Sequence, residues 1–152
     1  MSVLEEPRER LLSWERRIPS PARSVLRGIG QVFFQANALT GVCFVLGIVF
    51  GSPLMALVAV VGATIGWATT QVLKFDEAEV GAGLYGFNST LVGIATFFFF
   101  GPGLASMFLL MGGWAIAALL TWVVRRHVPL PTYTAPFIVA TWGSSSWGWR
   151  WG

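Results

Sequence analysis

Hydrophobic residues occur along this chain in long blocks that contain no charged residue. Two stretches, 28–73 and 80–124, carry no Asp, Glu, Lys or Arg. A helix needs roughly 20 apolar residues to cross about 30 Å of hydrocarbon. Each stretch is too long for one crossing, so the pattern predicts that each crosses a membrane at least twice.

Turn residues divide these blocks into predicted helices. Gly-Pro turns at 51–53 and 101–103 leave crossings over 54–73, 80–100 and 104–124. Before them, a polar break at 37–40 separates a short half-helix over 29–36 from the first crossing, which continues from Gly41. A last helix is predicted to begin near Thr134, between two prolines.

The predicted class is an all-α, polytopic membrane protein with about five transmembrane helices and one half-membrane, re-entrant helix. Three regions follow from the pattern. Residues 1–27 form a cytoplasmic, amphipathic and basic segment that lies on the membrane surface. Residues 28–142 form the transmembrane repeat, and residues 143–152 form an irregular tail rich in Trp, Ser and Gly.

Charge and composition support this class and predict the orientation. The chain is 55% apolar and only 11% charged. A soluble fold of this size would need more polar surface than this composition provides. Six of the ten basic residues precede the first apolar block, Lys74 lies in one loop and two arginines end the 104–124 crossing. Short cytoplasmic segments collect Lys and Arg, so we expect an N-terminus in the cytoplasm and a location in the cell (inner) membrane.

Several motifs are assigned to packing or solvent rather than to chemistry. The G-x-G-x-x-G pattern at 81–86 has no preceding strand and no acidic residue after it, which excludes a dinucleotide fingerprint. The only cysteine, Cys43, is expected to be a small buried residue. No Ser/His/Asp, Cys/His or metal-ligand constellation is present. We expect neither an enzyme nor a cofactor or metal.

Neutral polar residues mark the breaks in the apolar blocks. They are Gln31, Asn88, Thr132 and Thr134, with phenylalanines between them. Neutral hydrogen-bonding groups beside rings suit a small, planar, uncharged solute, whereas an ion path usually shows charges or rings of carbonyls. Hydrogen bonds between helices are the alternative interpretation of the same groups. The acids of the 74–79 loop are predicted to be solvated, with a vestibule for polar solutes as the alternative.

Three motifs in order and spacing resemble the urea transporter family, as a single N-terminal-type repeat. They are Gln31-Val32-Phe33-Phe34 leading into Asn37-Ala38-Leu39-Thr40-Gly41, then Gly83-Leu84-Tyr85-Gly86-Phe87-Asn88 with Leu91-Val92-Gly93, and Leu130-Pro131-Thr132-Tyr133-Thr134-Ala135-Pro136-Phe137. The resemblance implies that the chain is one half of an inverted-repeat urea channel fold. It also implies passive permeation of urea and assembly of the protomers into a trimer.

The resemblance also implies roles for five substrate-binding residues. Gln31 would mark a urea site, Phe34 and Phe87 would be slot rings, Leu91 would line the constriction and Thr134 would supply a hydroxyl. The implied partners are urea or a similar small neutral amide and the lipid bilayer.

The chain holds one copy of a unit that family members contain twice. We therefore expect either a homo-oligomer or a missing second repeat, and we interpret the tail as the product of a truncated or shifted reading frame, with an interfacial tail as the alternative. The alternative function is a non-transporting membrane subunit or remnant, which packs with a partner through Gly62 and Gly112-Gly113.

Overall fold

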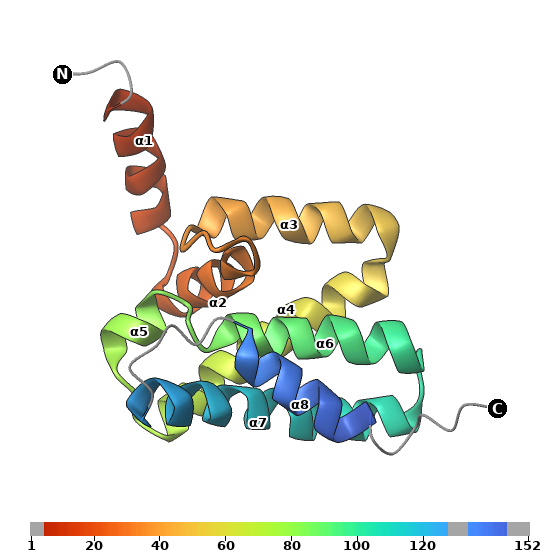
Figure 1. The fold of residues 1–152 in the computed structure, drawn as a ribbon. Coiled ribbons are helices and arrows are strands. Elements are labelled where there is room, and N and C mark those ends of the chain that lie inside the picture. The colour runs from red at the N-terminus through yellow and green to blue at the C-terminus, as the bar shows by residue number, and fades with distance from the viewer. Residues whose placement is uncertain (1–4, 128–133, 146–152) are drawn as a thin grey trace.

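Helices are the only regular elements in the computed structural model over the residues that it describes, 5–127 and 134–145 (Figure 1). In chain order they are α1 (Glu5–Arg16), α2 (Ser20–Gly30), the 3-10 helix η1 (Gln31–Phe33), α3 (Ala38–Gly51), α4 (Pro53–Val72), α5 (Glu77–Gly81), α6 (Gly86–Phe100), α7 (Leu104–His127) and α8 (Ala135–Ser145). The predicted all-α, polytopic membrane class is confirmed.

Helix α6 lies at the centre of the bundle. It packs against α4, α7, α2 and α8 (Figure 1). An apolar core forms where α4, α6 and α7 meet, with Val58, Val92 and Trp114 among its buried side chains. Helix α1 projects away from this bundle and crosses the direction of its long helices (Figure 1).

Glycines set the close spacing of the central helices. A Cβ added to Gly62 would stand 2.8 Å from the Ser89 carbonyl oxygen and 2.7 Å from the Trp114 indole nitrogen. The prediction of a partner surface at Gly62 is therefore wrong, because α6 and α7 already occupy that face. Gly113 also packs inside, near Val92, while Gly112 meets nothing within 4 Å. Small-residue spacing signals close helix contact without saying which helix makes it.

Within 5–127 and 134–145, two helices are long and apolar enough to cross a membrane, α4 with 20 residues and α7 with 24. A third candidate is the pair formed by Ser20–Phe33 and Ala38–Gly51, which is bent by 72°. Helix α6 has 15 residues and spans about 22 Å at about 1.5 Å per residue. The predicted number of about five spans therefore exceeds the number of described helices of spanning length, since α3 with 14 residues, α6 with 15 and α8 with 11 are each shorter than one crossing needs.

The helix before the first break is longer than predicted. The expected half-helix over 29–36 is wrong in its bounds, since α2 starts at Ser20 and η1 ends at Phe33. Pro21 lies in the first turn of α2, where a missing N–H costs nothing. Arg23 and Arg27 are therefore part of the broken helix, and the interruption predicted at Pro19 separates α1 from α2.

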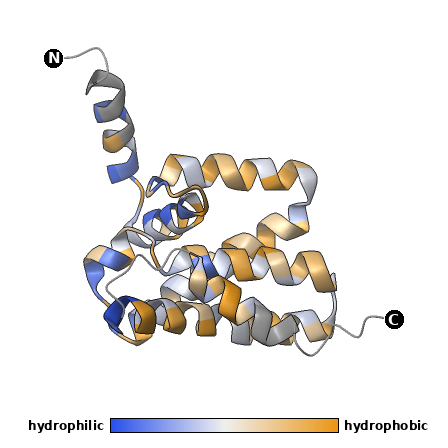
Figure 2. Cartoon of the chain, in the orientation of Figure 1, coloured by the Kyte–Doolittle hydropathy of each residue, from blue (hydrophilic) through white to orange (hydrophobic). Residues whose placement is uncertain are grey.

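The charged segments gather at one end of the bundle, as the basic-residue pattern predicts. Hydrophilic residues are concentrated in α1, α2, α5 and the last turn of α7, while the turns after α3 and α6 lie at the opposite end (Figure 2). Helix α8 starts at Ala135, beside the predicted start, and continues through Ser145. The remaining tail, 146–152, lies outside the described residues.

Cys43 is exposed on α3, so the prediction of a buried cysteine is wrong. Helix α3 buries only Ala38 and Gly41, near its start, against α2. Later along the helix, Leu46, Val49 and Phe50 are exposed, while Phe44 and Ile48 are half-buried.

Candidate functional site

The first helix break separates η1 from α3. Phe34 directly follows η1 and lies in the left-handed region with φ 58°, a conformation that costs a non-glycine residue about 1–2 kcal/mol. Asn37 then starts α3, and its Oδ1 accepts hydrogen bonds from the backbone N–H of Leu39 at 2.7 Å and of Thr40 at 3.4 Å. The break is thus a built feature with its own cap.

The second helix break, residues 82–85, separates α5 from α6. Gly83 has φ +80°, and a Cβ there would stand 2.3 Å from the Gly28 nitrogen. A Cβ on Gly28 would in turn stand 3.1 Å from Gly86 Cα. Gly83 and Gly86 of the G-x-G-x-x-G pattern therefore pack closely against α2, whereas a Cβ at Gly81 would meet nothing within 4 Å.

The two breaks are joined by polar side chains from the end of α2. Gln31 Nε2 donates a hydrogen bond to the Ala82 carbonyl oxygen at 3.2 Å. One turn earlier, Arg27 Nη1 donates to the Gly81 carbonyl oxygen at 3.0 Å. Gln31 thus lies at the joint between both irregular segments, and its side chain is half-buried there.

Helix α6 carries two more of the predicted substrate-binding residues. Phe87 is 6% exposed, and Leu91, one turn later, is half-buried. Phe34 differs, because 61% of it is exposed. Of the two predicted slot rings, the described part of the chain therefore encloses Phe87 and leaves Phe34 largely exposed.

The fifth predicted residue, Thr134, precedes α8 and is half-buried. Its carbonyl oxygen accepts the first backbone hydrogen bond of that helix, from Ile138 N–H at 3.0 Å. Both η1 and α8 pack against α6, so the structure brings the elements that carry Gln31, Phe87 and the Thr134 turn to one shared helix. Thr132 lies outside the described residues.

Asn88 is fully buried and bonds to two neighbouring helices. Its Nδ2 donates to Thr121 Oγ1 on α7 at 3.1 Å, and its Oδ1 accepts from the Phe137 backbone N–H at 3.2 Å. The neighbouring Ser89 hydroxyl donates to the Trp114 carbonyl oxygen at 2.9 Å. These contacts correspond to the interhelical hydrogen bonds that the sequence offered as the alternative interpretation.

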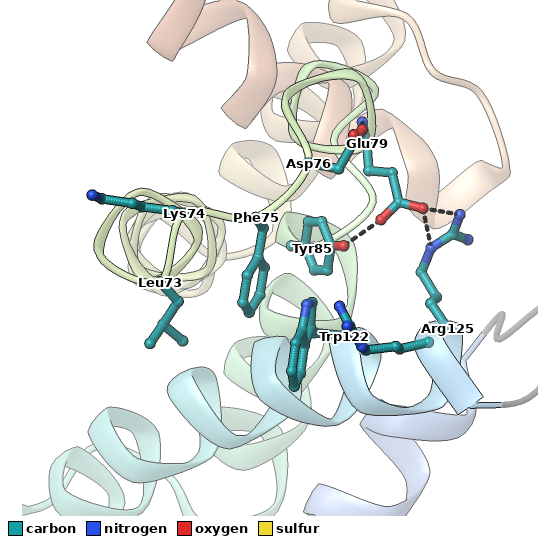
Figure 3. A pocket seen from close by; sticks show the side chains of 9 residues that line it. Leu73, Lys74, Phe75, Asp76, Glu79, Tyr85, Trp122 and Arg125 are labelled. Atoms are coloured by element: carbon teal, nitrogen blue, oxygen red, sulfur yellow. Dashed lines mark hydrogen bonds and ion pairs between the residues drawn. The ribbon is translucent and has the colours of Figure 1, made fainter.

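A pocket of about 410 Å³ opens at the charged end of the bundle (Figure 3). It is lined by Leu73, Lys74, Phe75, Asp76, Glu79, Tyr85, Trp122, Arg125 and Arg126. The Phe75 and Trp122 rings stack, with centroids 5.4 Å apart and planes 9° apart. The pocket combines an aromatic wall with a charged rim.

Glu79 is fixed in this pocket rather than simply solvated. Arg125 Nε donates to its Oε1 at 2.9 Å, and the Tyr85 hydroxyl donates to its Oε2 (Figure 3). The hydrogen bond from Arg125 is the main cause that lowers the pKa of Glu79, and burial opposes it. Asp76 caps α5 through Ala78 and Glu79 N–H. The prediction of a solvated acidic loop is therefore wrong for Glu79.

A second ion pair, between Glu15 of α1 and Arg27 of α2, was not predicted from the sequence. Arg27 Nε lies 2.9 Å from Glu15 Oε1, and Nη2 lies 3.0 Å from Oε2. The hydrogen bond from Arg27 is the main cause that lowers the pKa of Glu15. Glutamates that alternate with arginines in 1–27 indicate that ion pairs can form there. The sequence alone does not say which glutamate pairs with which arginine.

Among the residues in 5–127 and 134–145, no three His, Cys, Asp or Glu side chains gather as a metal site. At the helix joint, the carbonyls of Gly81 and Ala82 accept hydrogen bonds from Arg27 and Gln31, so this joint is built from hydrogen-bonding donors and acceptors.

Comparison with known proteins places most of this chain in a protein family. Residues 22–145 match the family described as urea transporter. The chain is similar to urea transporter 1 of Mus musculus, with 40% identity over 70 residues, and to urea transporter 1 of Ovis aries, with 41% identity over 70 residues. In both cases the alignment covers 46% of this chain and 18% of the relative's length.

Proposed function

Because this chain belongs to the urea transporter family, we propose that it provides a passive membrane path for urea or a similar small, neutral amide. The relatives that it matches are named as urea transporters, which favours transport over catalysis. The path is passive in this proposal, since the sequence shows neither a nucleotide fingerprint nor charged residues within its two apolar stretches that would suit a coupling ion.

The observation that carries the proposal is the joint between the two helix breaks. Irregular backbone at membrane depth is stable only where protein buries it or where it lines a wet cavity. Here Gln31 bonds to the Ala82 carbonyl oxygen across the joint, and the amide and carbonyl are uncharged. Urea has four N–H donors and one carbonyl, so neutral acceptors along a narrow path replace the water that it loses.

We assign the substrate contacts to five residues. Gln31 offers its amide at the end of η1, and Thr134 offers a hydroxyl at the turn before α8. Phe34 and Phe87 offer ring faces for the flat faces of urea, and Leu91 narrows the path one turn beyond Phe87. The exposed Phe34 ring supports a path that a second repeat or another copy of the chain completes.

Stopped-flow light scattering of proteoliposomes tests the proposal. Vesicles that contain this chain should admit urea faster than empty vesicles under the same gradient, with unchanged glycerol entry. Gln31→Ala and Thr134→Val should lower urea entry while membrane insertion stays intact. Thr64→Val is the matched control, because Thr64 is exposed on α4 and its hydroxyl donates within its own helix, to the Val60 carbonyl oxygen.

Two results would oppose the proposal in different ways. Urea entry equal to that of empty vesicles removes permeation by this chain. Entry that is raised by the chain but unchanged in both variants removes the assigned residues and leaves the transport function in place.

A second candidate is a non-transporting membrane subunit that packs with a partner. The exposed apolar side chains of α7 favour it, together with the open Gly112; they include Leu104, Met107, Phe108 and Met111. Light scattering of the purified protein in detergent separates the two cases. A trimer supports the channel assembly that the family resemblance implies, whereas a monomer that associates only with another protein supports the subunit.

We also propose that the chain lies in the cell (inner) membrane with its N-terminus in the cytoplasm. The support is the gathering of α1, α5 and the basic end of α7 at one end of the bundle (Figure 2). A protease added outside intact cells should leave an N-terminal epitope tag uncut, and cleavage of the tag would reverse the orientation.

A further inference from the structure

We propose that Glu15 and Arg27 are a positioning pair that holds the two helix breaks of the permeation site in register. This inference rests on the proposed function, because it assigns these residues to the support of that site. It also gives α1, expected from the sequence to lie on the membrane surface, a place in the site's construction.

Glu15 makes more contacts than a surface carboxylate needs. It lies in the last turn of α1 but is only 4% exposed, and both of its oxygens accept hydrogen bonds from the Arg27 guanidinium. Its Oε1 also accepts a hydrogen bond from the Ala38 backbone N–H at 2.7 Å. One carboxylate thus joins α1 and α2 to the first residue of α3.

Arg27 extends this network to the second break. Its Nη1 donates to the Gly81 carbonyl oxygen at 3.0 Å. The next carbonyl along the chain, that of Ala82, accepts the hydrogen bond from Gln31. Fixing the Gly81 carbonyl therefore fixes the backbone that the proposed urea-contacting side chain uses.

The helix ends explain why a charged pair is suited to this place. The first N–H groups of a helix have no partner inside the helix, and its N-terminus carries partial positive charge. Asn37 satisfies the N–H groups of Leu39 and Thr40, and Glu15 satisfies that of Ala38. Two capping residues, one local and one from α1, together complete the start of α3.

The glycines at the closest contact in the joint have no side chain that could hold it. Gly28, Gly83 and Gly86 lie against one another there and offer only backbone. A bidentate arginine and carboxylate pair constrains orientation as well as distance. The Arg27 fork reaches over this glycine contact to the Gly81 carbonyl, which explains how α2 and the break before α6 keep one alignment.

Amide hydrogen exchange tests the pair without relying on transport. In Glu15→Ala, the Ala38 amide should exchange at least about tenfold faster, because it loses a charge-assisted hydrogen bond. The Leu39 and Thr40 amides serve as internal references, since Asn37 still holds them. Glu15→Gln, which keeps one acceptor oxygen, should give an intermediate rate, and Arg16→Gln, an exposed cation on the same helix, should change nothing.

Urea entry in a double-mutant cycle tests the functional role. Arg27→Gln should lower urea entry roughly tenfold when Gln31 is present. It should lower entry little further in the Gln31→Ala background, because the pair acts through the position of Gln31. A purely structural role predicts the same fold loss in both backgrounds, together with loss of folded protein in gel filtration.

Each outcome decides the proposal. Unchanged Ala38 exchange in Glu15→Ala overturns the pair, and so does an equal loss of urea entry in both backgrounds. If the unsubstituted chain admits no urea, the proposed transport function fails. The amide exchange data then decide the proposal alone. Faster exchange at Ala38 in Glu15→Ala and at Gly83–Gly86 in Arg27→Gln would support the pair. Unchanged exchange at these amides would refute it.

Discussion

Replacing Gly41 with alanine places a methyl group where α2 and α3 touch. A Cβ at Gly41 would stand 2.0 Å from the Leu26 carbonyl oxygen, whereas real Cβ atoms keep at least 3.0 Å from such neighbours. The obstacle is backbone, so no side chain can rotate out of the way. Gly41→Ala therefore forces α2 and α3 apart at the start of α3.

The magnitude follows from two opposing effects. Overpacking of this kind costs about 1–3 kcal/mol or more. Alanine also favours a helix over glycine by about 1 kcal/mol, which offsets part of the cost. Because the contact is with rigid backbone, we expect the upper end of the first range and a net loss of about 2 kcal/mol in the free energy of unfolding.

Gly47→Ala is the matched control, because Gly47 lies on the same helix and a Cβ there meets nothing within 4 Å. The control should raise stability by about 0.5–1 kcal/mol through helix propensity alone. Unfolding of both variants by SDS in mixed micelles, followed by circular dichroism, measures the difference. Equal stability of the two variants would refute the close packing of α2 on α3.

Three further predictions concern polar contacts. Asn88→Leu should cost about 1–3 kcal/mol in the same titration, because it leaves the half-buried Phe137 N–H without its acceptor and removes the bond to Thr121; a loss below about 0.5 kcal/mol would contradict this. Asn37→Ala should cost about 1 kcal/mol through loss of the α3 cap, and unchanged thermal unfolding would count against the cap. The pKa of folded Glu15 lies below its ordinary value of 4.5, so its stabilising contribution should be complete above that value and should disappear as pH falls through the folded-state pKa. The gap in melting temperature between the unsubstituted chain and Glu15→Ala should therefore close in acid, and a gap that widens would oppose the reasoning.

Local sequence features determined several elements of this protein. Pro53 and the following apolar run specify α4. Arg125 and Arg126 mark the end of α7. A start near Thr134 was predicted for the last helix, which begins at Ala135. These predictions succeeded because turn residues, charges and hydrophobic length act over a few neighbouring positions.

The extent of α2 shows where local reasoning failed. The basic residues Arg23 and Arg27 suggested a separate flank before the apolar block, yet they lie in the same helix as Gly28. Arg27 is tolerated there because Glu15 and the Gly81 carbonyl accept its hydrogen bonds. Neither partner is visible from the sequence around Arg27.

Asn88 and Gly62 illustrate the same limit within the bundle. From the sequence, Asn88 could equally be a group that lines a pore or one that bonds to another helix. In the structure it bonds to Thr121 on α7 and to the start of α8, so it is a contact between helices. Gly62 was interpreted as part of a surface for a partner protein. In the structure, Ser89 and Trp114 of the same chain pack against it. Spacing identifies a face that packs closely, but not what packs on it.

The sequence by itself determined an all-α membrane chain with its charges at one end and uncharged polar groups at helix breaks. Only the tertiary structure decided that the break at Gln31 meets the break at Ala82, and that Glu15 and Arg27 join them. The physical reason is range: hydrophobicity and turn propensity act between neighbours in the chain, whereas hydrogen bonds between residues 51 or 54 positions apart exist only after the helices have packed.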